Sequence, residues 1–344
     1  EFNVSPSERI LSYLNLGHIS ELVATFFGQL QGGYRVYFTD YIKEVVDNRE
    51  KFREMFPSIL QVVLPTIFLA VPKVWVNFRK EIRHKTWYIP VDLGKQGLIR
   101  DHVVDKIKDR LGFKETRRFI SAGSKFSMKE ANFFSKLGIY IDDIYGQTET
   151  GGPLTINGKI IGGASVMIGK KDEILVEGPN VMLGYFNKPE ATAKVLKNGI
   201  YRTGDVGMWT THLYGLPFVN LRRDPEGLVF CGGRLDDGFK LANGEFVSPE
   251  KVEELEEAIR KIEGADEAIV CGEGKSYVVA LVFSSKPSRK LNRKLEIEMA
   301  EIGHGMYRIG NFLLTNSTEL ELTPTMKVRR KRMLQKLQRE IDTL

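Results

Sequence analysis

Apolar and polar positions alternate most clearly in the last third of the chain. Residues 268–271 and 277–283 are runs of branched and apolar residues, which are typical of strands. Upstream, Ser248 precedes Pro249, and proline at a first helical position predicts a charged helix over residues 250–262. This pattern predicts a small α+β domain that begins after a boundary near residue 235.

A β-α-β unit is predicted in the middle of the chain. Residues 118–122 form the first strand, and SMKE from Ser127 is a capping box that starts a helix ending at Gly138. Residues 139–144 form the returning strand. Ligands gather at the loops that follow strands in such sheets, so the loops around residues 122–124 and 146–148 are candidate sites.

The remaining segments complete the expected architecture. Residues 4–120 indicate mixed helix and strand, with strands at 10–14, at 35–38 and in the apolar run 62–71, and charged helix over 76–110. Residues 152–230 indicate short strands with glycine turns, at 173–177, 201–205 and 228–230, and a turn at Gly232 and Gly233.

The fold class expected from these segments is α/β, in three parts and without internal repeats. Residues 1–150 are a partial large domain with a mixed sheet flanked by helices, 151–235 a β-rich subdomain, and 236–344 a small α+β C-terminal domain. A chain of 344 residues is long enough for two or more domains.

Charge and cysteine content narrow the functional classes. Two cysteines, Cys231 and Cys271, cannot build a disulfide framework, which favours a reducing compartment. The net charge is +6, and a basic run occupies residues 327–332. Such a run is the solvated face of a helix, or it contacts an anionic ligand or surface. Nucleic acid is disfavoured, because the run lacks interleaved aromatic residues.

Membrane insertion and secretion have little support in the sequence. No secretory signal is visible, and the longest apolar stretch, residues 62–71, is interrupted by Pro65 and is far shorter than the roughly 20 residues of a spanning helix. A cytoplasmic location is expected, and a peripheral contact with an intracellular membrane stays open. The first residues are Glu1 and Phe2 rather than methionine, so an upstream part is expected to be missing.

Two motifs carry candidate chemistry. YGQTET at residues 145–150 and YRTGD at residues 201–205 each place a hydroxyl and a carboxylate beside glycine. Such turns suit a phosphate, a sugar diol or a metal ion, and either alone is a weak signal.

With further segments in a fixed order, the chain resembles the acyl-activating superfamily of AMP-forming acid–thiol ligases, nearest the long-chain and bubblegum-type fatty acyl-CoA synthetases. The matching segments are SYLNLGH (12–18), FLAVPKVW (68–75), SAGS (121–124), YGQTE (145–149), GYFNKPE (184–190), YRTGD (201–205), GRLDDGFK (233–240) and PTMK (324–327). They correspond to the later part of the family's large domain and to its small lid domain.

The resemblance implies ATP-dependent activation of a long-chain fatty acid to acyl-AMP and then to acyl-CoA, with ATP, Mg²⁺ and coenzyme A. Thr148 and Glu149 would be catalytic, Thr148 donating to phosphate and Glu149 holding Mg²⁺ through oxygen. Tyr145 and Gly146 would lie at the adenine, beside Gly123 and Ser124. Each residue also has a plain structural interpretation, as a solvated turn or a core aromatic.

The ribose and lid contacts are implied in the same way. One carboxylate can accept both hydroxyls of a ribose diol, which is the role implied for Asp205, with Arg234 in support. Asp236 matches the hinge of the lid, and Lys327 matches its catalytic lysine. His18 lies where the family has a residue near the acyl pocket, although a lone histidine is often structural.

One implied part has no counterpart in this sequence. The family grips the triphosphate with a Ser/Thr/Gly-rich loop that ends in lysine, and no segment before His18 fits it. Three explanations stay open: a cut part of a complete enzyme, a chain that pairs with a separate N-terminal piece, or a degenerate structural, scaffolding or nucleotide-binding subunit. The first is favoured, because the candidate site residues Thr148, Glu149, Asp205, Arg234 and Lys327 are retained. The departures at Ser124 and Gly238 argue mildly for the last.

Overall fold

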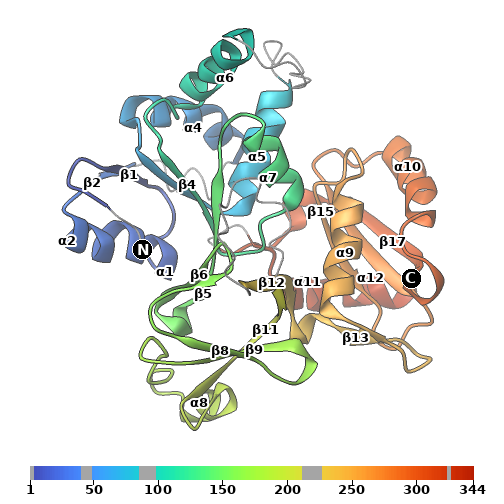
Figure 1. Ribbon diagram of the computed structural model, residues 1–344. Helices are drawn as coiled ribbons and strands as arrows, with labels where there is room; N and C mark the ends of the chain where they lie inside the picture. The colour runs from blue at the N-terminus through green and yellow to red at the C-terminus, as the bar shows by residue number, and fades with distance from the viewer. Residues whose placement is uncertain (1–3, 40–48, 85–97, 211–226, 324–326) are drawn as a thin grey trace. The chain divides into compact units, whose positions relative to one another are not determined.

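The computed structural model describes residues 4–39, 49–84, 98–210, 227–323 and 327–344 (Figure 1). The chain divides into two compact units. Unit 1 comprises Glu1–Met167, Leu175–Arg202 and Trp209–Val229, and unit 2 comprises Ile168–Ile174, Thr203–Met208 and Phe230–Leu344. The boundaries predicted after residues 150 and 235 stay predictions.

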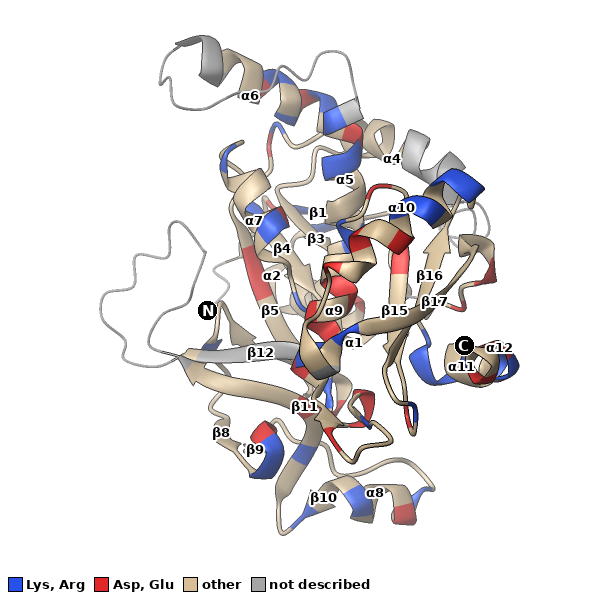
Figure 2. Ribbon diagram, turned by 90° about the vertical axis from the view of Figure 1, so that its right-hand side faces the viewer, with Lys and Arg blue, Asp and Glu red and all other residues tan. Residues whose placement is uncertain are grey.

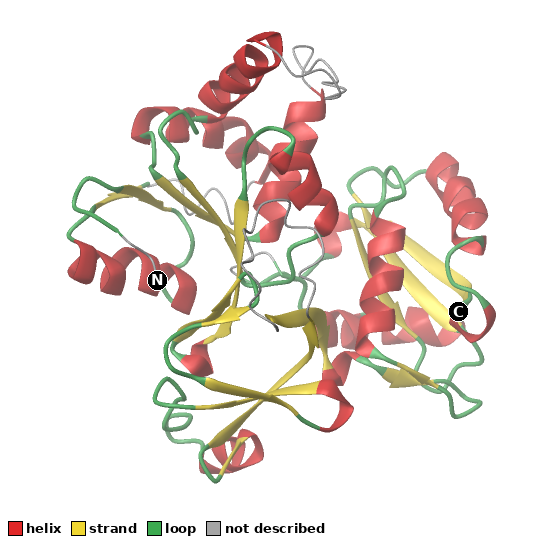
Figure 3. Cartoon of the chain, viewed as in Figure 1, coloured by secondary structure: helices red, strands yellow, loops and turns green. Residues whose placement is uncertain are grey.

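The main sheet of unit 1 has seven strands in the order β2-β1-β3-β4-β5-β6-β7 (Figure 3). Its strands from β2 to β5 are parallel, whereas β6 and β7 are antiparallel, so the sheet is mixed as predicted. The strands are β1 Arg9–Ser12, β2 Arg35–Phe38, β3 Ile67–Ala70, β4 Arg118–Ala122, β5 Ile141–Gln147, β6 Gly152–Ile156 and β7 Lys159–Ile160.

Helices flank this sheet. They are α1 Ile19–Leu22, a π-helical turn Val23–Phe27, α2 Gly28–Gly32, α4 Arg49–Val63, α5 Pro72–His84, α6 Leu98–Leu111 and α7 Met128–Ser135. The core beneath α5 and α7 is aromatic: Trp75 is fully buried, and its ring centroid lies 5.2 Å from that of Phe134 and 5.3 Å from that of Phe68. Helix α5 begins at Pro72, so Trp75 lies at the end of its first turn, where its side chain packs in the core.

A second, smaller sheet matches the predicted β-rich texture. Its order is β10-β11-β9-β8, with β12 paired to β11. The elements are β8 Ser165–Ile168, a 3₁₀ turn Lys170–Asp172, β9 Glu173–Glu177, α8 Pro189–Val195, β10 Leu196–Lys197, β11 Ile200–Thr210 and β12 Gly227–Arg234.

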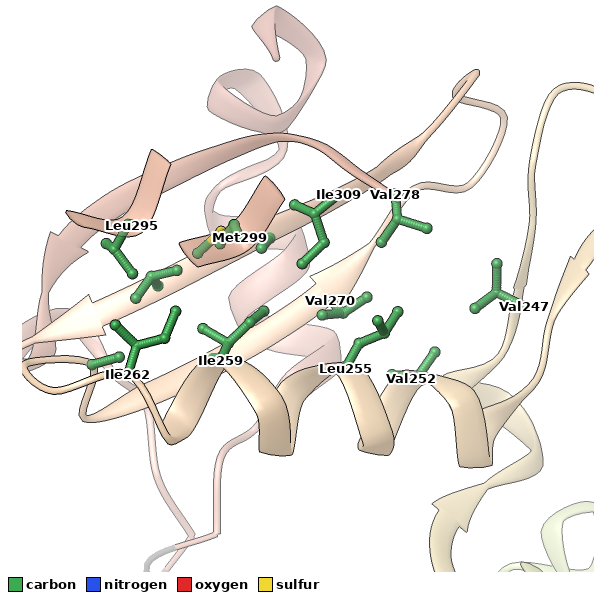
Figure 4. Packing of buried hydrophobic residues seen from close by; sticks show 14 of the residues in the cluster. Val247, Val252, Leu255, Ile259, Ile262, Val270, Val278, Leu295, Met299 and Ile309 are labelled. Carbon is green, nitrogen blue, oxygen red and sulfur yellow. The ribbon is translucent and has the colours of Figure 1, made fainter. Parts of the chain in front are cut away.

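The C-terminal part of unit 2 is a three-stranded sheet with helices on both faces (Figures 1 and 4). Residues of α9 and α10 pack on one face, and residues of α11 and α12 pack on the other. The elements are a 3₁₀ turn η4 Leu235–Asp237, β13 Phe239–Lys240, β14 Phe246–Val247, α9 Pro249–Arg260, β15 Glu267–Cys271, β16 Val278–Ser284, α10 Arg289–Ala300, 3₁₀ turns Gly305–Tyr307 and Ser317–Glu319, β17 Ile309–Asn316, α11 Arg330–Lys336 and α12 Gln338–Thr343.

Two local expectations were wrong. Residues 62–63 end α4 instead of starting a strand, and Leu64 follows with a φ of +47°, because a short apolar run suits a helix end as well as a strand. Gly232 and Gly233 lie within β12 and do not form a turn. A Cβ on Gly233 would lie 2.5 Å from Cβ of Pro249, so this glycine permits a close approach.

The helices of the structure also bear on whether the chain could cross a membrane. None of the helices in the described ranges has both the length and the apolar composition needed to span a bilayer.

Candidate functional site

The YGQTE motif is a turn that closes on itself at the end of β5. Thr148–Thr150 form a 3₁₀ turn, and the backbone N–H of Gln147 donates to the Thr150 hydroxyl at 3.1 Å. A Cβ on Gly146 would lie 2.0 Å from the carbonyl oxygen of Gly152 on the paired strand, so a larger residue cannot occupy this position. The turn is therefore rigid, and Thr148 at its tip is exposed.

Glu149 is oriented by residues that the motif does not contain. The Tyr185 hydroxyl donates to Oε1 of Glu149 at 2.7 Å, and the N–H of Met182 donates to its carbonyl oxygen at 2.8 Å. The hydroxyl of Tyr201 donates to Oε1 of Gln147 in the same turn. Tyr185 lies within the GYFNKPE segment, but only the folded chain shows this contact.

The adenine-side candidates lie at one edge of the sheet. Strands β4 and β5 are parallel, with Ala122 paired to Ile144. Gly123, directly after β4, is therefore next in register to Tyr145, which lies near the end of β5. Gly123 has a φ of +93°, a conformation that L side chains rarely adopt, which accounts for glycine there. Ser124 is half-buried, as is Tyr145.

A half-buried carboxyl, that of Asp143, lies two residues before Tyr145 on the same face of β5. Asp143 is paired in the ladder with Ser121 of β4, whose hydroxyl is fully buried. Burial raises the pKa of Asp143 to about 7, against the opposing attraction of Lys125. The predictions missed this group, because DD in a strand gives no sign of which aspartate faces inward.

His18 is the residue before α1. Its backbone N–H donates to the carbonyl oxygen of Asn15 at 2.9 Å, and partial burial lowers its pKa. No described contact assigns it a chemical role, so the acyl-pocket role stays a prediction.

In unit 2, the YRTGD motif holds Asp205 at a fixed place on β11. Asp205 is 5% exposed, its Oδ1 accepts from Nη1 of Arg234 at 3.1 Å, and its N–H donates to the Thr203 hydroxyl at 3.0 Å. Gly204 between them has a φ of +70°, and a Cβ there would lie 2.8 Å from Nη2 of Arg234. Two predicted residues, Asp205 and Arg234, are therefore in direct contact.

Arg234 also begins the turn η4, which contains the predicted hinge. Its backbone N–H donates to Oδ2 of Asp237 at 3.1 Å. Asp236 is exposed, and its Oδ2 accepts from Nζ of Lys331 at 2.7 Å. This hydrogen bond from Lys331 lowers the pKa of Asp236, with burial acting weakly in the opposite direction.

Lys327 is exposed and precedes α11 by three residues. Its N–H donates to the Thr323 hydroxyl at 3.1 Å, and its carbonyl oxygen accepts from the Thr323 N–H at 2.7 Å. Residues 321–323 and 327–329 are thus joined by short-range hydrogen bonds, and we call this segment the clip. The basic run begins in the clip and continues into α11. Residues 324–326 of the PTMK segment lie outside the described residues.

The predicted residues thus form two groups, one within each unit. Unit 1 contains Gly123, Ser124, Tyr145, Gly146, Thr148 and Glu149, and unit 2 contains Asp205, Arg234, Asp236 and Lys327. Among the described residues, no three His, Cys, Asp or Glu side chains gather as a metal site. One oriented carboxylate such as Glu149 suits Mg²⁺ that takes its other ligands from phosphates and water.

A family model described as AMP-binding enzyme matches residues 1–186, and one described as AMP-binding enzyme C-terminal domain matches residues 236–344. Long-chain-fatty-acid–CoA ligase ACSBG2 of Mus musculus is 26% identical over 315 residues, covering 79% of this chain and 44% of that protein. Long-chain-fatty-acid–CoA ligase FadD15 of Mycobacterium bovis is 24% identical, covering 98% of this chain and 62% of that protein. The chain thus spans about half the length of the curated relatives it matches.

Solved structures show the same fold. The adenylation domain of a carboxylate reductase from Mycobacterium chelonae has a TM-score of 0.71 and 19% identity, with coverage of 98% of this chain and 54% of that one. An O-succinylbenzoate coenzyme A synthetase from Bacillus subtilis, solved with ATP and magnesium, has a TM-score of 0.64 and 18% identity, with coverage of 96% and 62%. The chain has the α/β adenylation-domain fold with a C-terminal domain, and it belongs to the AMP-binding enzyme family.

Proposed function

We propose that this chain provides magnesium, ribose and lysine contacts in an ATP-dependent fatty acid–CoA ligase. The observation that carries the proposal is the buried Asp205, which Arg234 and the Gly204 turn hold in one position. A carboxylate held in one position at a glycine turn is suited to two hydroxyls of a ribose.

In the first half-reaction a carboxylate oxygen of the acid attacks the α-phosphorus of ATP. A new P–O bond forms, the bond to the leaving pyrophosphate breaks, and acyl-AMP results. Negative charge shifts onto phosphate oxygens, so positively charged groups and aimed donors lower the barrier. We assign Lys327 to the acid and the α-phosphate, and Thr148 to a phosphate oxygen. Mg²⁺ held by Glu149 would offset phosphate charge.

In the second half-reaction a thiol replaces AMP. The thiol of coenzyme A loses its proton and attacks the acyl carbonyl carbon, and the bond to the AMP oxygen breaks. We assign the hinge role to Asp236, because the exposed turn η4 joins the β11–β12 region to the C-terminal sheet. Tyr145, Gly146, Gly123 and Ser124 are assigned to adenine, which their shared sheet edge supports.

The substrate class is supported by the named relatives. ACSBG2 and FadD15 are named long-chain-fatty-acid–CoA ligases, and they match at 24–26% identity. We therefore propose a long-chain fatty acid as the acid and coenzyme A as the thiol. We also propose a cytoplasmic site of action with peripheral access to membrane lipids, where such acids partition.

Binding of a non-hydrolysable acyl-adenylate analogue tests the proposal directly. Titration calorimetry with a palmitoyl-sulfamoyl adenosine should show binding that Asp205→Asn weakens about 10- to 100-fold, because a charged hydrogen-bond acceptor is lost. Glu177→Gln, at an exposed position on β9, is the matched control and should bind normally. Equal affinity of the Asp205 variant and the wild type would remove the ribose assignment.

Pyrophosphate release tests turnover. Palmitate-dependent release should fall by about 10²- to 10³-fold in Lys327→Ala, while Lys290→Ala, at an exposed lysine on α10, should be unaffected. Analogue binding without any turnover by the wild-type chain would favour a nucleotide-binding subunit. Absence of both would reject the proposed function.

A further inference from the structure

The basic run at residues 327–332 is not uniformly solvated. The side chains of Lys331 and Arg332 are 71% and 64% exposed, whereas that of Arg330 is only 16% exposed. One positive charge of the run therefore lies inside unit 2. A charge in that position is costly unless its partners are also buried.

The partners of Arg330 are on two elements of the C-terminal sheet layer. Its Nη1 donates to Oε1 of Glu256 on α9, and its Nη2 donates to the carbonyl oxygen of Val270 on β15. Glu256 is 6% exposed and also accepts from the Val270 N–H at 2.7 Å. The planar guanidinium serves both acceptors at once, which an ammonium group cannot do in the same geometry.

A third contact of Arg330 reaches the predicted hinge. Its Nε lies 3.7 Å from Oδ1 of Asp237, the last residue of η4. The next residue, Lys331, pairs with Asp236 of the same turn. Two ion pairs therefore join the start of α11 to the turn η4. The Arg330–Asp237 pair is half-buried, and the Lys331–Asp236 pair is exposed.

The segment that carries Lys327 is held by its own hydrogen bonds and by contacts with α11, including the ion pair between Arg332 and Glu321. It is a clip in which Leu322 and Val328 form an isolated β-bridge, and Arg329 returns its N–H to the carbonyl oxygen of Glu321 at 2.9 Å. Arg330 comes directly after the clip. The buried contacts of Arg330 with Glu256 and Val270 therefore fix the end of the clip against α9 and β15.

We propose that Arg330 is a positioning residue that sets the place of the Lys327 clip and couples it to the hinge turn through Asp237. The catalytic meaning of this coupling rests on the proposed function, but the coupling itself does not. A change at the turn alters the Arg330 contacts and so reaches Lys327, and the reverse holds because coupling between two sites is reciprocal.

Hydrogen exchange of the full chain tests the coupling without any ligand. In Arg330→Gln, exchange of residues 320–323, 327–329 and 234–238 should become about tenfold faster, while β16 should stay protected. Arg330→Lys should restore part of the protection. Arg339→Gln, at an exposed position on α12, is the control and should leave both segments unchanged.

A second variant keeps the test valid if Arg330→Gln does not fold. Asp237→Asn removes the negative charge on the hinge side of the contact and keeps an oxygen that can accept from the Arg234 N–H. It should speed exchange in residues 320–323 and 327–329 several-fold and raise the rate at which an amine reagent modifies Lys327 relative to Lys290. Unchanged exchange and labelling in Asp237→Asn would overturn the coupling. Equal loss of protection in β16 and in the clip would reduce Arg330 to a purely structural role.

The outcome is separable from that of the proposed function. In an active chain, Arg330→Lys should lower kcat for pyrophosphate release and leave the affinity for the acyl-adenylate analogue within twofold. Activity retained in Lys327→Ala would reject the catalytic assignment of that lysine, whereas the exchange results would still decide the coupling.

Discussion

The seven-stranded sheet of unit 1 and the three-stranded sheet of unit 2 differ in how completely the described residues cover them. In unit 2, alternate residues of β16 enter two cores: Val278, Ala280 and Val282 face α9 and α10 (Figure 4), whereas Val279, Leu281 and Phe283 face α11 and α12. In unit 1, the sheet ends at β2, where the side chain of Phe38 is 66% exposed.

Apolar side chains are also exposed on the helical turns between β1 and β2. Phe27 and Leu30, on the helical turns before β2, are 53% and 68% exposed. Charge follows a different pattern, since acidic residues occur both on β5 of unit 1 and along α9 of unit 2 (Figure 2). The difference therefore lies in apolar cover. Among the described residues, the three-stranded sheet is covered on both faces, whereas β2 at the edge of the unit 1 sheet exposes apolar side chains.

The largest expected effect tests the closed core. Phe283→Ala should destabilise unit 2 by about 3 to 5 kcal/mol, because a fully buried aromatic side chain leaves a cavity. Phe27→Ala in unit 1 should change stability by less than about 0.5 kcal/mol. Urea unfolding followed by hydrogen exchange of each unit measures both values, and similar losses in the two variants would contradict the contrast.

The next effect concerns Asp143, the half-buried carboxyl on β5 of unit 1. Burial raises the pKa of Asp143 to about 7, above its unfolded value near 4, so the folded state holds the proton more tightly. Stability should fall as pH rises through this window and level off above it. Asp143→Asn should remove the slope and stabilise unit 1 by about 2 to 4 kcal/mol at pH 8.

The matched control is Asp105→Asn, at an exposed position on α6. Its unfolding free energy from pH 4 to 8 should follow the wild type. A slope that persists in Asp143→Asn would show that another group causes the pH dependence of unit 1.

Local pattern predicted the closed unit better than the open one. The alternation in residues 268–271 and 277–283 predicted β15 and β16, and Pro249 predicted the start of α9, because period and capping are properties of neighbouring residues. The run at 62–64 failed because α4 ends there. A short apolar run does not distinguish a helix end from a strand.

The site was predicted as a set of residue types but not as a set of contacts. Motif order singled out Glu149 and Asp205. No local signal indicated that Tyr185, 36 residues away in sequence, donates to Glu149, or that Glu256 accepts from Arg330 across 74 residues. Partners so distant in sequence are defined only by the packing of the folded chain.

A smaller effect is expected at the magnesium candidate. Tyr185→Phe removes the hydroxyl that orients Glu149, and it should cost about 0.5 to 1.5 kcal/mol of stability. Calorimetry should show weaker ATP binding in the presence of Mg²⁺, by about threefold to tenfold, and little change without it. Tyr37→Phe on β2 is the control, and a loss independent of Mg²⁺ would argue against the role of Glu149.

The smallest effect on stability tests the open edge itself. An unpaired strand with exposed apolar side chains promotes association of edges, and a charged residue opposes it. Phe38→Lys should change the free energy of unfolding by less than about 0.5 kcal/mol, yet lower the concentration dependence of the sedimentation coefficient. Ile297 on α10, which is 69% exposed but lies on a covered unit, provides the control variant Ile297→Lys. If both variants lowered association equally, exposed apolar residues in general would be responsible, and the edge of β2 would have no special part in it.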